Sequence, residues 1–336
     1  MKTDVILFMG EGKVEIGSDE VSEPKDGELL IEAEATLISS GTEMICLDRK
    51  FEKGTSWDSW VQYPFRPGYS HAGRVRKVGA NVAGFAEGDR VFTRLHHARH
   101  VIAKAADAVK VPASVDGESA AWSGLAKIVQ VGVRRAEHKL GDAVVVIGMG
   151  PLGQLAVRYI RLLGPRELVA VDPVEGRLAL AKKGGATVAL AKPVADCIAD
   201  LKALTNGALA DVVYDVTGNA KVLAPALSLV RKLGTFVLVG DTGFPSGQCI
   251  SDRLLVKGIR LVGAHDGLPP REASPQEPWS HKAMMELFLR YLERGQMSVK
   301  DLVTHRFPFA RAAEAFSLLR ERRGETMGVV LTWAKA

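Results

Sequence analysis

Short apolar runs separated by glycine, proline and aspartate dominate the first third of the chain. Residues 1–7 are expected to form a first strand, and β-rich runs follow at 28–33, 73–78, 90–92 and 100–103. Glycine, proline and aspartate between such runs favour tight turns over helices. This part of the chain is therefore predicted to be a compact β-barrel-like domain that opens with a strand.

The pattern changes after residue 114. A helix is predicted over 119–131, and a continuous apolar run at 143–147 is typical of a strand buried on both faces of a parallel sheet. Strands and helices then alternate, which is typical of a doubly wound α/β domain, the Rossmann type. The further strands are expected at 168–171, 188–190, 212–215, 235–239 and 259–263, and the helices at 154–163, 177–183 and 220–232.

The C-terminal segment returns to the first domain in this interpretation. Residues 265–280 carry four prolines and are expected to form a loop, followed by helices at 282–294 and 310–322 and a strand at 328–333. A length of 336 residues also favours two domains. The expected fold class is α/β, with a β-barrel domain formed by 1–124 and 266–336 and a nucleotide-binding Rossmann domain inserted at 125–265.

Composition and charge exclude several classes of protein. The net charge is +5, but lysine and arginine are scattered among nearly equal numbers of acids, so no nucleic-acid partner is expected. No run approaches the roughly 18 apolar residues of a membrane helix, and the N-terminus lacks a signal-peptide pattern, so a cytoplasmic protein is expected. Cys46, Cys197 and Cys249 are far apart, which indicates neither a disulfide framework nor a compact thiolate zinc site.

A glycine-rich turn follows the buried strand at 143–147. Its sequence is Gly148-Met149-Gly150-Pro151-Leu152-Gly153, and it opens a predicted helix whose free N–H groups favour phosphate binding. Asp172 ends the next strand, about 20 residues after the last glycine, as a dinucleotide site requires. A carboxylate there accepts hydrogen bonds from a ribose 2′-hydroxyl and repels a 2′-phosphate, so NAD is favoured. Arg177 would offset part of that repulsion, which leaves NADP as the alternative.

Several segments together resemble the medium-chain dehydrogenase/reductase superfamily of the zinc alcohol dehydrogenase type. They are Ser40-Gly41-Thr42-Glu43, residues 67–73, 88–91 and 141–148, and the tail 313–316. The resemblance implies a GroES-like barrel plus a Rossmann domain, an NAD(P)-dependent oxidoreductase, and a homodimer joined through the edge strand 259–262. It also extends the expected cofactor-binding residues to Thr217, Val239, Gly240, Ala264 and His265, with His265 where the family chain passes the nicotinamide carboxamide.

The metal ligands of that family are replaced in this chain. Ser40 stands where the family has a zinc-binding cysteine, Tyr69 and Ser70 stand for its histidine and glutamate, and Ser123 takes the place of a third ligand. Hydroxyls are poor zinc ligands, and the family's four-cysteine structural lobe is also missing. We therefore expect no zinc. The motifs also resemble a branch grouped with bacteriochlorophyllide dehydrogenase, which oxidises a hydroxyethyl group.

Side chains must then replace the metal at the reacting oxygen. The resemblance places Ser40, Thr42 and Tyr69 around the metal's position, with Thr42 as a proton-relay hydroxyl and Tyr69 as either a hydrogen-bond donor or inert packing. In a strand over 95–100, His96 and His97 would point to opposite faces, and either is an acid–base candidate or a packing residue.

Two further polar residues near these motifs, His71 and Glu43, are interpreted as follows. His71 falls in a buried strand and is expected to be a core residue, and Glu43 is expected either to position a neighbour or to form a structural salt bridge.

The expected reaction interconverts an alcohol and a ketone or aldehyde on a small molecule. Aromatic residues indicate either a bulky or ring-bearing substrate or packing against the barrel: Trp57, Trp60, Tyr63, Phe65 and Trp279. An enoyl or quinone-type reductase and a non-catalytic NAD(P)H-binding protein are the alternatives. Neither a membrane nor a nucleic acid is expected as a partner.

Overall fold

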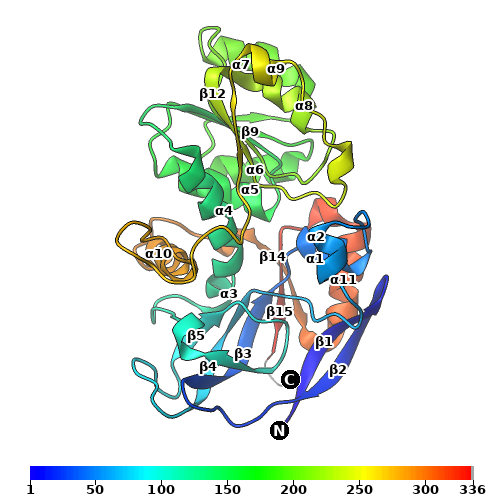
Figure 1. Ribbon diagram of the computed structural model, residues 1–336, viewed down its shortest axis with the longest axis vertical. Helices are drawn as coiled ribbons and strands as arrows, with labels where there is room; N and C mark the ends of the chain where they lie inside the picture. Colours follow the sequence, from blue (N-terminus) through cyan, green and yellow to red (C-terminus); the bar gives the residue numbers. More distant parts are fainter. Residues whose placement is uncertain (334–336) are drawn as a thin grey trace. The chain divides into compact units, whose positions relative to one another are not determined.

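A computed structural model describes residues 1–333 of the chain, which folds into two compact units (Figure 1). Of the described residues, the barrel unit comprises 1–127 and 270–333, and the Rossmann unit comprises 128–269. Together they confirm the expected fold class, α/β, with a β-barrel domain and a parallel Rossmann sheet. Among residues 1–333, no helix is both long and apolar enough to cross a membrane.

The barrel unit is built around a seven-stranded sheet in the order β14-β15-β3-β4-β5-β7, with β6 also paired to β3. Strand β3 pairs with β4, β6 and β15, so it forms the centre of the unit. The strands are β1 (Lys2–Gly10), β2 (Lys13–Glu20), β3 (Glu28–Leu37), β4 (His71–Val78), β5 (Arg90–Thr93), β6 (His100–Lys104), β7 (Val109–Lys110), β14 (Val303–Pro308) and β15 (Gly328–Thr332).

Helices complete the barrel unit, and the last of those before the Rossmann sheet, α4, begins in this unit and continues into the Rossmann unit from residue 128. Helix α11 lies against the hairpin of β1 and β2, where Phe316 meets Phe8 edge to face with ring centroids 5.1 Å apart (Figure 1). The helices are α1 (Thr42–Leu47), α2 (Ser56–Trp60), α3 (Gly117–Ala120), α4 (Ser123–Ala136), α10 (His281–Glu293) and α11 (Ala312–Glu321), and a 3₁₀ turn, η1 (Ala105–Asp107), precedes β7.

The Rossmann unit contains a six-stranded parallel sheet in the order β10-β9-β8-β11-β12-β13. Every residue of β8 is buried, as its continuous apolar sequence predicts. The chain reverses its direction of winding between β8 and β11, which is where ligands bind in this architecture. The elements are β8 (Ala143–Ile147), α5 (Pro151–Arg161), β9 (Glu167–Val171), α6 (Glu175–Gly184), β10 (Val188–Leu190), α7 (Ile198–Leu204), β11 (Ala210–Asp215), α8 (Leu223–Ala226), β12 (Val230–Leu238), α9 (Arg253–Val256) and β13 (Arg260–Gly263).

Two expected helices are wrong in extent. The helix expected over 119–131 is interrupted between α3 and α4 at the fully buried Trp122, whose indole packs where a side chain at Gly328 would lie. The helix expected over 220–232 is only α8 followed by a short 3₁₀ turn. Pro225 lies in α8, and Val230 already belongs to β12 and pairs with the buried Ala210. Tertiary packing and strand pairing override helical periodicity at both places.

The histidine-bearing segment 94–97 is not the strand that the sequence suggested. It forms an irregular loop between β5 and β6, held by hydrogen bonds from Ile6 N to His97 O and from His97 N to Pro67 O. The alternation of side chains expected for a strand therefore does not apply to His96 and His97.

Candidate active site

The three glycines after β8 meet different spatial demands. Gly148 has a φ of +93°, which favours glycine, and a Cβ there would lie 2.8 Å from the Thr217 side chain. At Gly150 a Cβ would meet nothing within 4 Å, so the backbone is open on that side. At Gly153 a Cβ would lie 1.8 Å from the Gly148 carbonyl oxygen. Pro151 opens α5, as expected for a first helical residue. The turn has the shape that brings a pyrophosphate to a helix N-terminus.

Asp172, directly after β9, is tied to the glycine turn. One carboxylate oxygen accepts a 2.7 Å hydrogen bond from the Met149 N–H, and the other accepts from Val174 N at 2.8 Å. Arg177 Nη1 lies 4.0 Å from this carboxylate. The buried Gln154 donates to the carbonyl oxygens of Met149 and Arg177 and so joins the same network. Sequence reasoning missed Gln154, because a glutamine one turn into a helix carries no distinctive spacing.

The ends of β11 and β12 are joined by backbone hydrogen bonds. Thr217 donates through its N–H (2.9 Å) and its hydroxyl (2.6 Å) to the Asp215 carboxylate, and burial raises the pKa of that carboxyl. The N–H groups of Val239 and Gly240 both donate to the Asp215 carbonyl oxygen at 3.0 Å. A Cβ on Gly240 would lie 2.3 Å from Gly218 N. Thr217, Val239 and Gly240 therefore lie at the carboxyl edge of the sheet.

The expected cofactor residues after β13 lie at the same edge. Ala264 is buried, and its N–H donates to the Leu238 carbonyl oxygen at 2.9 Å. The exposed His265 accepts a hydrogen bond from Gly267 N through its own Nδ1 at 3.0 Å. The remaining turn residues, Leu152 and Pro151, lie in the first turn of α5.

A cluster of hydroxyls surrounds Tyr69 in the barrel unit. The phenol donates to Ser39 Oγ at 2.6 Å, and Thr42 Oγ1 lies 3.3 Å from the same phenol oxygen. The Arg94 guanidinium lies over the Tyr69 ring, 5.5 Å from its centroid. Ser40, the serine singled out in the sequence, is buried next to this cluster, whereas Ser39 makes the short contact. Nothing in the sequence distinguished these two adjacent serines, because their roles depend on which one faces Tyr69.

His97 and Glu43 form a buried pair beside this cluster. His97 Nε2 lies 3.0 Å from Glu43 Oε2, and the two side chains are 0% and 2% exposed. The His97 ring is therefore enclosed by protein on all sides in this structure. The Glu43 carboxylate is therefore paired inside the unit, which is compatible with both interpretations of this residue, a positioning role and a structural salt bridge.

The neighbouring His96 has different surroundings. Burial first, and then the positive charge of Arg66, lower the pKa of His96 to about 4. Arg66 is itself paired with Asp19 on β2, through two hydrogen bonds of 2.8 and 2.9 Å. His71 lies in β4, fully buried as expected, and donates through Nε2 to the Ala98 carbonyl oxygen at 3.1 Å.

Two of the positions that correspond to the family's metal ligands, Tyr69 and Ser123, hold hydroxyls with hydrogen-bond partners, whereas the buried Ser70 Oγ has none among the described residues. The Tyr69 phenol bonds the two side chains described above, and Ser123 Oγ donates to the Ala120 carbonyl oxygen at 2.7 Å. Across residues 1–333, no three histidine, cysteine, aspartate or glutamate side chains are grouped so as to hold a metal ion. The donor set at these positions is therefore neutral oxygen.

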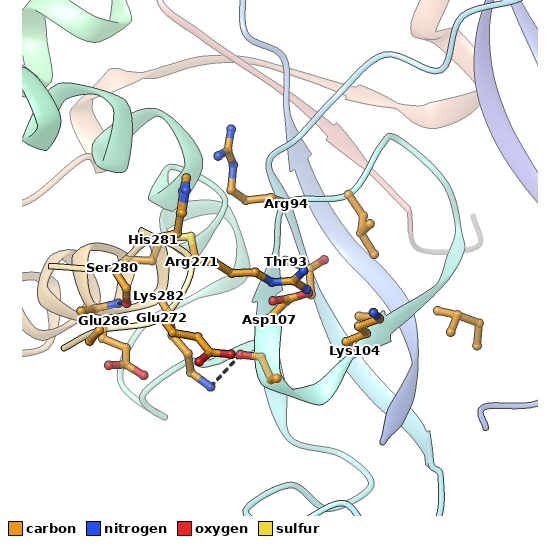
Figure 2. A pocket seen from close by; sticks show the side chains of 17 residues that line it. Thr93, Arg94, Lys104, Asp107, Arg271, Glu272, Ser280, His281, Lys282 and Glu286 are labelled. Carbon is orange, nitrogen blue, oxygen red and sulfur yellow. Dashed lines mark hydrogen bonds and ion pairs between the residues drawn. The ribbon is translucent and has the colours of Figure 1, made fainter. Parts of the chain in front are cut away.

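A cavity of about 850 Å³ opens in the barrel unit beside Arg94 (Figure 2). Figure 2 shows Arg94 and His281 extending toward the same side of it, whereas Lys104 and Glu286 lie lower in the view. Thr93 lines the wall with a buried hydroxyl that has no hydrogen-bond partner among the described residues. The wall consists of Thr93, Arg94, Leu95, Ile102, Ala103, Lys104, Ala106, Asp107, Arg271, Glu272, Ala273, Ser280, His281, Lys282, Ala283, Met285 and Glu286.

The aromatic residues singled out as possible pocket walls lie elsewhere. Trp57 belongs to the buried core, Tyr63 and Phe65 pack against that core, and the half-exposed Trp60 meets the Phe65 ring edge to face. The Tyr63 hydroxyl donates to the Cys46 carbonyl oxygen at 2.8 Å. None of these four residues lines the cavity, and neither does Trp279. The interpretation as packing against the barrel therefore holds for the four residues between 57 and 65.

Comparisons with known proteins agree with this architecture. Residues 25–114 match the alcohol dehydrogenase GroES-like domain, and residues 151–277 match the zinc-binding dehydrogenase domain. The chain is 27% identical to an L-threonine 3-dehydrogenase of Bacillus licheniformis, over 82% of this chain and 85% of that protein. It is 28% identical to a D-guloside 3-dehydrogenase of Escherichia coli, over 75% of this chain and 73% of that protein.

A solved structure shares the whole fold. It is an Escherichia coli oxidoreductase/dehydrogenase of unknown specificity involved in membrane biogenesis, 21% identical, which aligns with a TM-score of 0.85 over 100% of both chains. Two matched domains in the expected order, with the glycine turn and Asp172 at the carboxyl edge of the Rossmann sheet, define the family. The chain is a member of the medium-chain dehydrogenase/reductase superfamily and an NAD(P)-dependent dehydrogenase.

Proposed function

We propose that this dehydrogenase interconverts a secondary alcohol and its ketone, or a primary alcohol and its aldehyde, with NAD and without zinc. The observation that carries the proposal is the Tyr69 phenol, held 2.6 Å from Ser39 and 3.3 Å from Thr42. It stands at the sequence position of a family metal ligand. Relatives named as threonine and guloside 3-dehydrogenases support an alcohol as the reacting group.

Tyr69 supplies what the reacting oxygen requires. The nicotinamide, when bound, accepts the hydride that leaves the alcohol carbon or returns it to the carbonyl carbon. In reduction, the Tyr69 hydroxyl donates a proton to the oxygen that becomes the alcohol. In oxidation, the same oxygen returns its proton to Tyr69. Thr42 and Ser39 hold the phenol and give its proton a path through hydroxyls.

The cofactor-binding residues in this proposal fit a dinucleotide. The open face of Gly150 and the first turn of α5 suit the pyrophosphate. The ribose next to the adenine would meet Asp172, whose carboxylate favours NAD over NADP. Arg177, 4.0 Å from that carboxylate, keeps NADP as the weaker alternative. Met149, Thr217, Val239, Gly240, Ala264 and His265 complete the proposed cofactor site.

Zinc does not fit the residues present. A catalytic zinc needs about three strong nitrogen, sulfur or charged oxygen ligands, whereas Ser40, Tyr69 and Ser123 offer neutral hydroxyls. Two of these hydroxyls, those of Tyr69 and Ser123, are already hydrogen-bonded to protein groups. We therefore derive no step through a metal.

The substrate is proposed to enter the cavity beside Arg94. Its volume of about 850 Å³ lies within the range of small-molecule sites, roughly 300–1,000 Å³, and admits a bulky or ring-bearing molecule. Charged side chains of both signs and the buried Thr93 hydroxyl favour a polar substrate. Tyr69 is not among the lining residues, and we propose that Arg94, which lines the cavity and lies over the Tyr69 ring, connects the substrate to the proposed donor.

The proposal also includes a homodimer through β13. This strand is the last of its sheet, and the Leu261 side chain is 40% exposed on it. An edge strand with an exposed apolar residue is prone to pair with a second chain. Light scattering of the purified protein should give twice the mass of one chain. A monomer would remove this part of the proposal.

The experiment that tests the proposed function combines three measurements on one preparation. Metal analysis should find less than about one tenth of a zinc per chain, against the one per chain of a filled structural or catalytic site. Titration should find NADH bound more tightly than NADPH. Turnover of a panel of alcohols, ketones, enones and quinones should be confined to the alcohol–ketone pairs. One tightly bound zinc per chain would contradict the proposal, and reduction of enones alone would favour a double-bond reductase.

A further inference from the structure

A carboxylate and an imidazole lie against each other inside the barrel unit, away from solvent. One oxygen of Glu43 is 3.0 Å from His97 Nε2, and the other accepts a 2.8 Å hydrogen bond from Ser39 N. A buried carboxylate costs several kcal/mol unless its partners compensate. Two apolar side chains of similar volume are often equally favourable or better. Stability of the fold therefore gives no reason for this pair to be polar.

The surroundings of His97 indicate which ring nitrogen donates a hydrogen bond. Its Nδ1 is buried and has no partner among residues 1–333. A hydrogen on that nitrogen would lose its hydrogen bond, at a cost of about 1–3 kcal/mol. A carboxylate oxygen can only accept, so the hydrogen sits on Nε2, which donates to Glu43. The contact is a single directional bond between two fixed groups.

Both ends of Tyr69 are connected to this pair. On the hydroxyl side, Glu43 fixes the backbone of Ser39, whose side chain accepts the hydrogen bond from the Tyr69 phenol. On the backbone side, the His97 ring packs against Gly68, the residue before Tyr69. A Cβ on Gly68 would lie 2.8 Å from His97 Cδ2, and Gly68 has a φ of +101°. One buried bond thus joins the two segments that place the phenol.

We propose that Glu43 and His97 are positioning residues for Tyr69: their bond sets where the phenol hydroxyl lies, and neither residue touches the substrate. The proposal rests on the proposed function only in giving Tyr69 the role of proton donor. Near-attack geometry is demanding, and a displacement of about 1 Å costs roughly 100-fold in rate. Loss of the Glu43–His97 bond should therefore lower kcat while leaving cofactor binding unchanged.

Two substitutions of His97 separate the bond from the packing. His97→Leu removes the donor, whereas His97→Gln also loses the ring but keeps an N–H that can reach Glu43. We expect His97→Leu to lower kcat about 100-fold with KM changed less than about threefold, and His97→Gln to stay within about fivefold of the parent. NADH affinity should be unchanged in both. Equal losses in the two variants would overturn the proposal, since packing alone would then explain them.

A double-mutant cycle tests whether the pair acts through Tyr69. If it does, His97→Leu should cause little further loss in a protein that already carries Tyr69→Phe. Losses that add in full would overturn the proposal. Should His97→Leu fail to fold, Glu43→Gln takes its place in the cycle. The glutamine oxygen can still accept the hydrogen bond from Ser39 N, and this variant is expected to lower kcat about tenfold.

A readout independent of turnover keeps this test apart from the proposed function. The chain has five tyrosines, so ¹⁹F NMR of 3-fluorotyrosine-labelled protein can resolve Tyr69, assigned by its loss in Tyr69→Phe. The Tyr69 resonance should move in His97→Leu and in Glu43→Gln, while those of Tyr159 and Tyr214 stay in place. An unmoved Tyr69 resonance overturns the positioning role even if no alcohol is ever turned over. A moved resonance without alcohol turnover would reject the proposed reaction and retain the positioning role.

Discussion

In the Rossmann unit, the groups proposed to bind the cofactor follow successive parallel strands and meet because the carboxyl ends of those strands share one edge. In the barrel unit, the Tyr69 cluster is assembled from segments far apart in sequence: Tyr69 lies 30 residues from Ser39, and His97 lies 54 residues from Glu43. The first site is dictated by local turn geometry, whereas the second depends on the pairing of the whole barrel. Substitutions should therefore act differently in the two sites.

The glycine turn offers the largest expected effect. Gly153→Ala places a Cβ 1.8 Å from the Gly148 carbonyl oxygen, a backbone atom that cannot move aside. We expect a loss of about 3 kcal/mol in the free energy of unfolding and loss of NADH binding. Urea denaturation and NADH fluorescence titration measure the two effects.

Gly150→Ala is the matched control for the same turn. Its Cβ meets nothing within 4 Å, so the free energy of unfolding should change by less than about 0.5 kcal/mol. NADH should nevertheless bind about tenfold more weakly, because the added methyl group stands where the pyrophosphate approaches. A variant with parental NADH affinity would place the dinucleotide elsewhere.

The corresponding test of the barrel unit is Tyr69→Phe. Removing a positioned proton donor should lower kcat by at least about 100-fold, with NADH affinity unchanged. Tyr63→Phe removes a hydroxyl bonded to the Cys46 carbonyl oxygen in the same unit. It should cost about 1 kcal/mol of stability and leave kcat at the parental value. Unchanged turnover in Tyr69→Phe would remove this residue from the mechanism.

Cofactor choice provides a smaller effect in the Rossmann unit. Asp172→Asn removes the negative charge that would repel a 2′-phosphate but keeps an oxygen for the Met149 N–H. With Arg177 still nearby, the preference for NADH over NADPH should fall about tenfold in paired titrations. Asp200→Asn, whose carboxylate pairs with Lys192 near the surface, should leave the ratio unchanged. An unaltered ratio in Asp172→Asn would mean that another group reads the ribose.

The same contrast decides how much could be predicted from sequence. Hydrophobic periodicity and the spacing from Gly153 to Asp172 are local, so the fold class and the proposed cofactor turn followed directly from them. The role of Ser39 depends on which of two adjacent serines faces Tyr69, a residue in another segment. The Glu43–His97 pair depends on the conformation of a loop for which periodicity predicts a strand. Val230 was assigned to a helix because its pairing with Ala210 is invisible to a local pattern.

The smallest expected effect concerns acid stability of the barrel unit. Burial and the Arg66 charge lower the pKa of His96 to about 4, while an unfolded histidine has a pKa near 6.5. As the pH falls below 6.5, the unfolded chain takes up a proton that the folded chain excludes, so stability declines until about pH 4.

The variant His96→Gln removes this group. Between pH 7.5 and 5.5, its free energy of unfolding should therefore fall by about 1 kcal/mol less than that of the parent, measured by urea denaturation. Because His71, fully buried with its pKa lowered to about 3, remains in this variant, some acid sensitivity should persist. Identical pH dependence in His96→Gln and the parent would mean that His96 is as accessible to protons in the fold as in the unfolded chain.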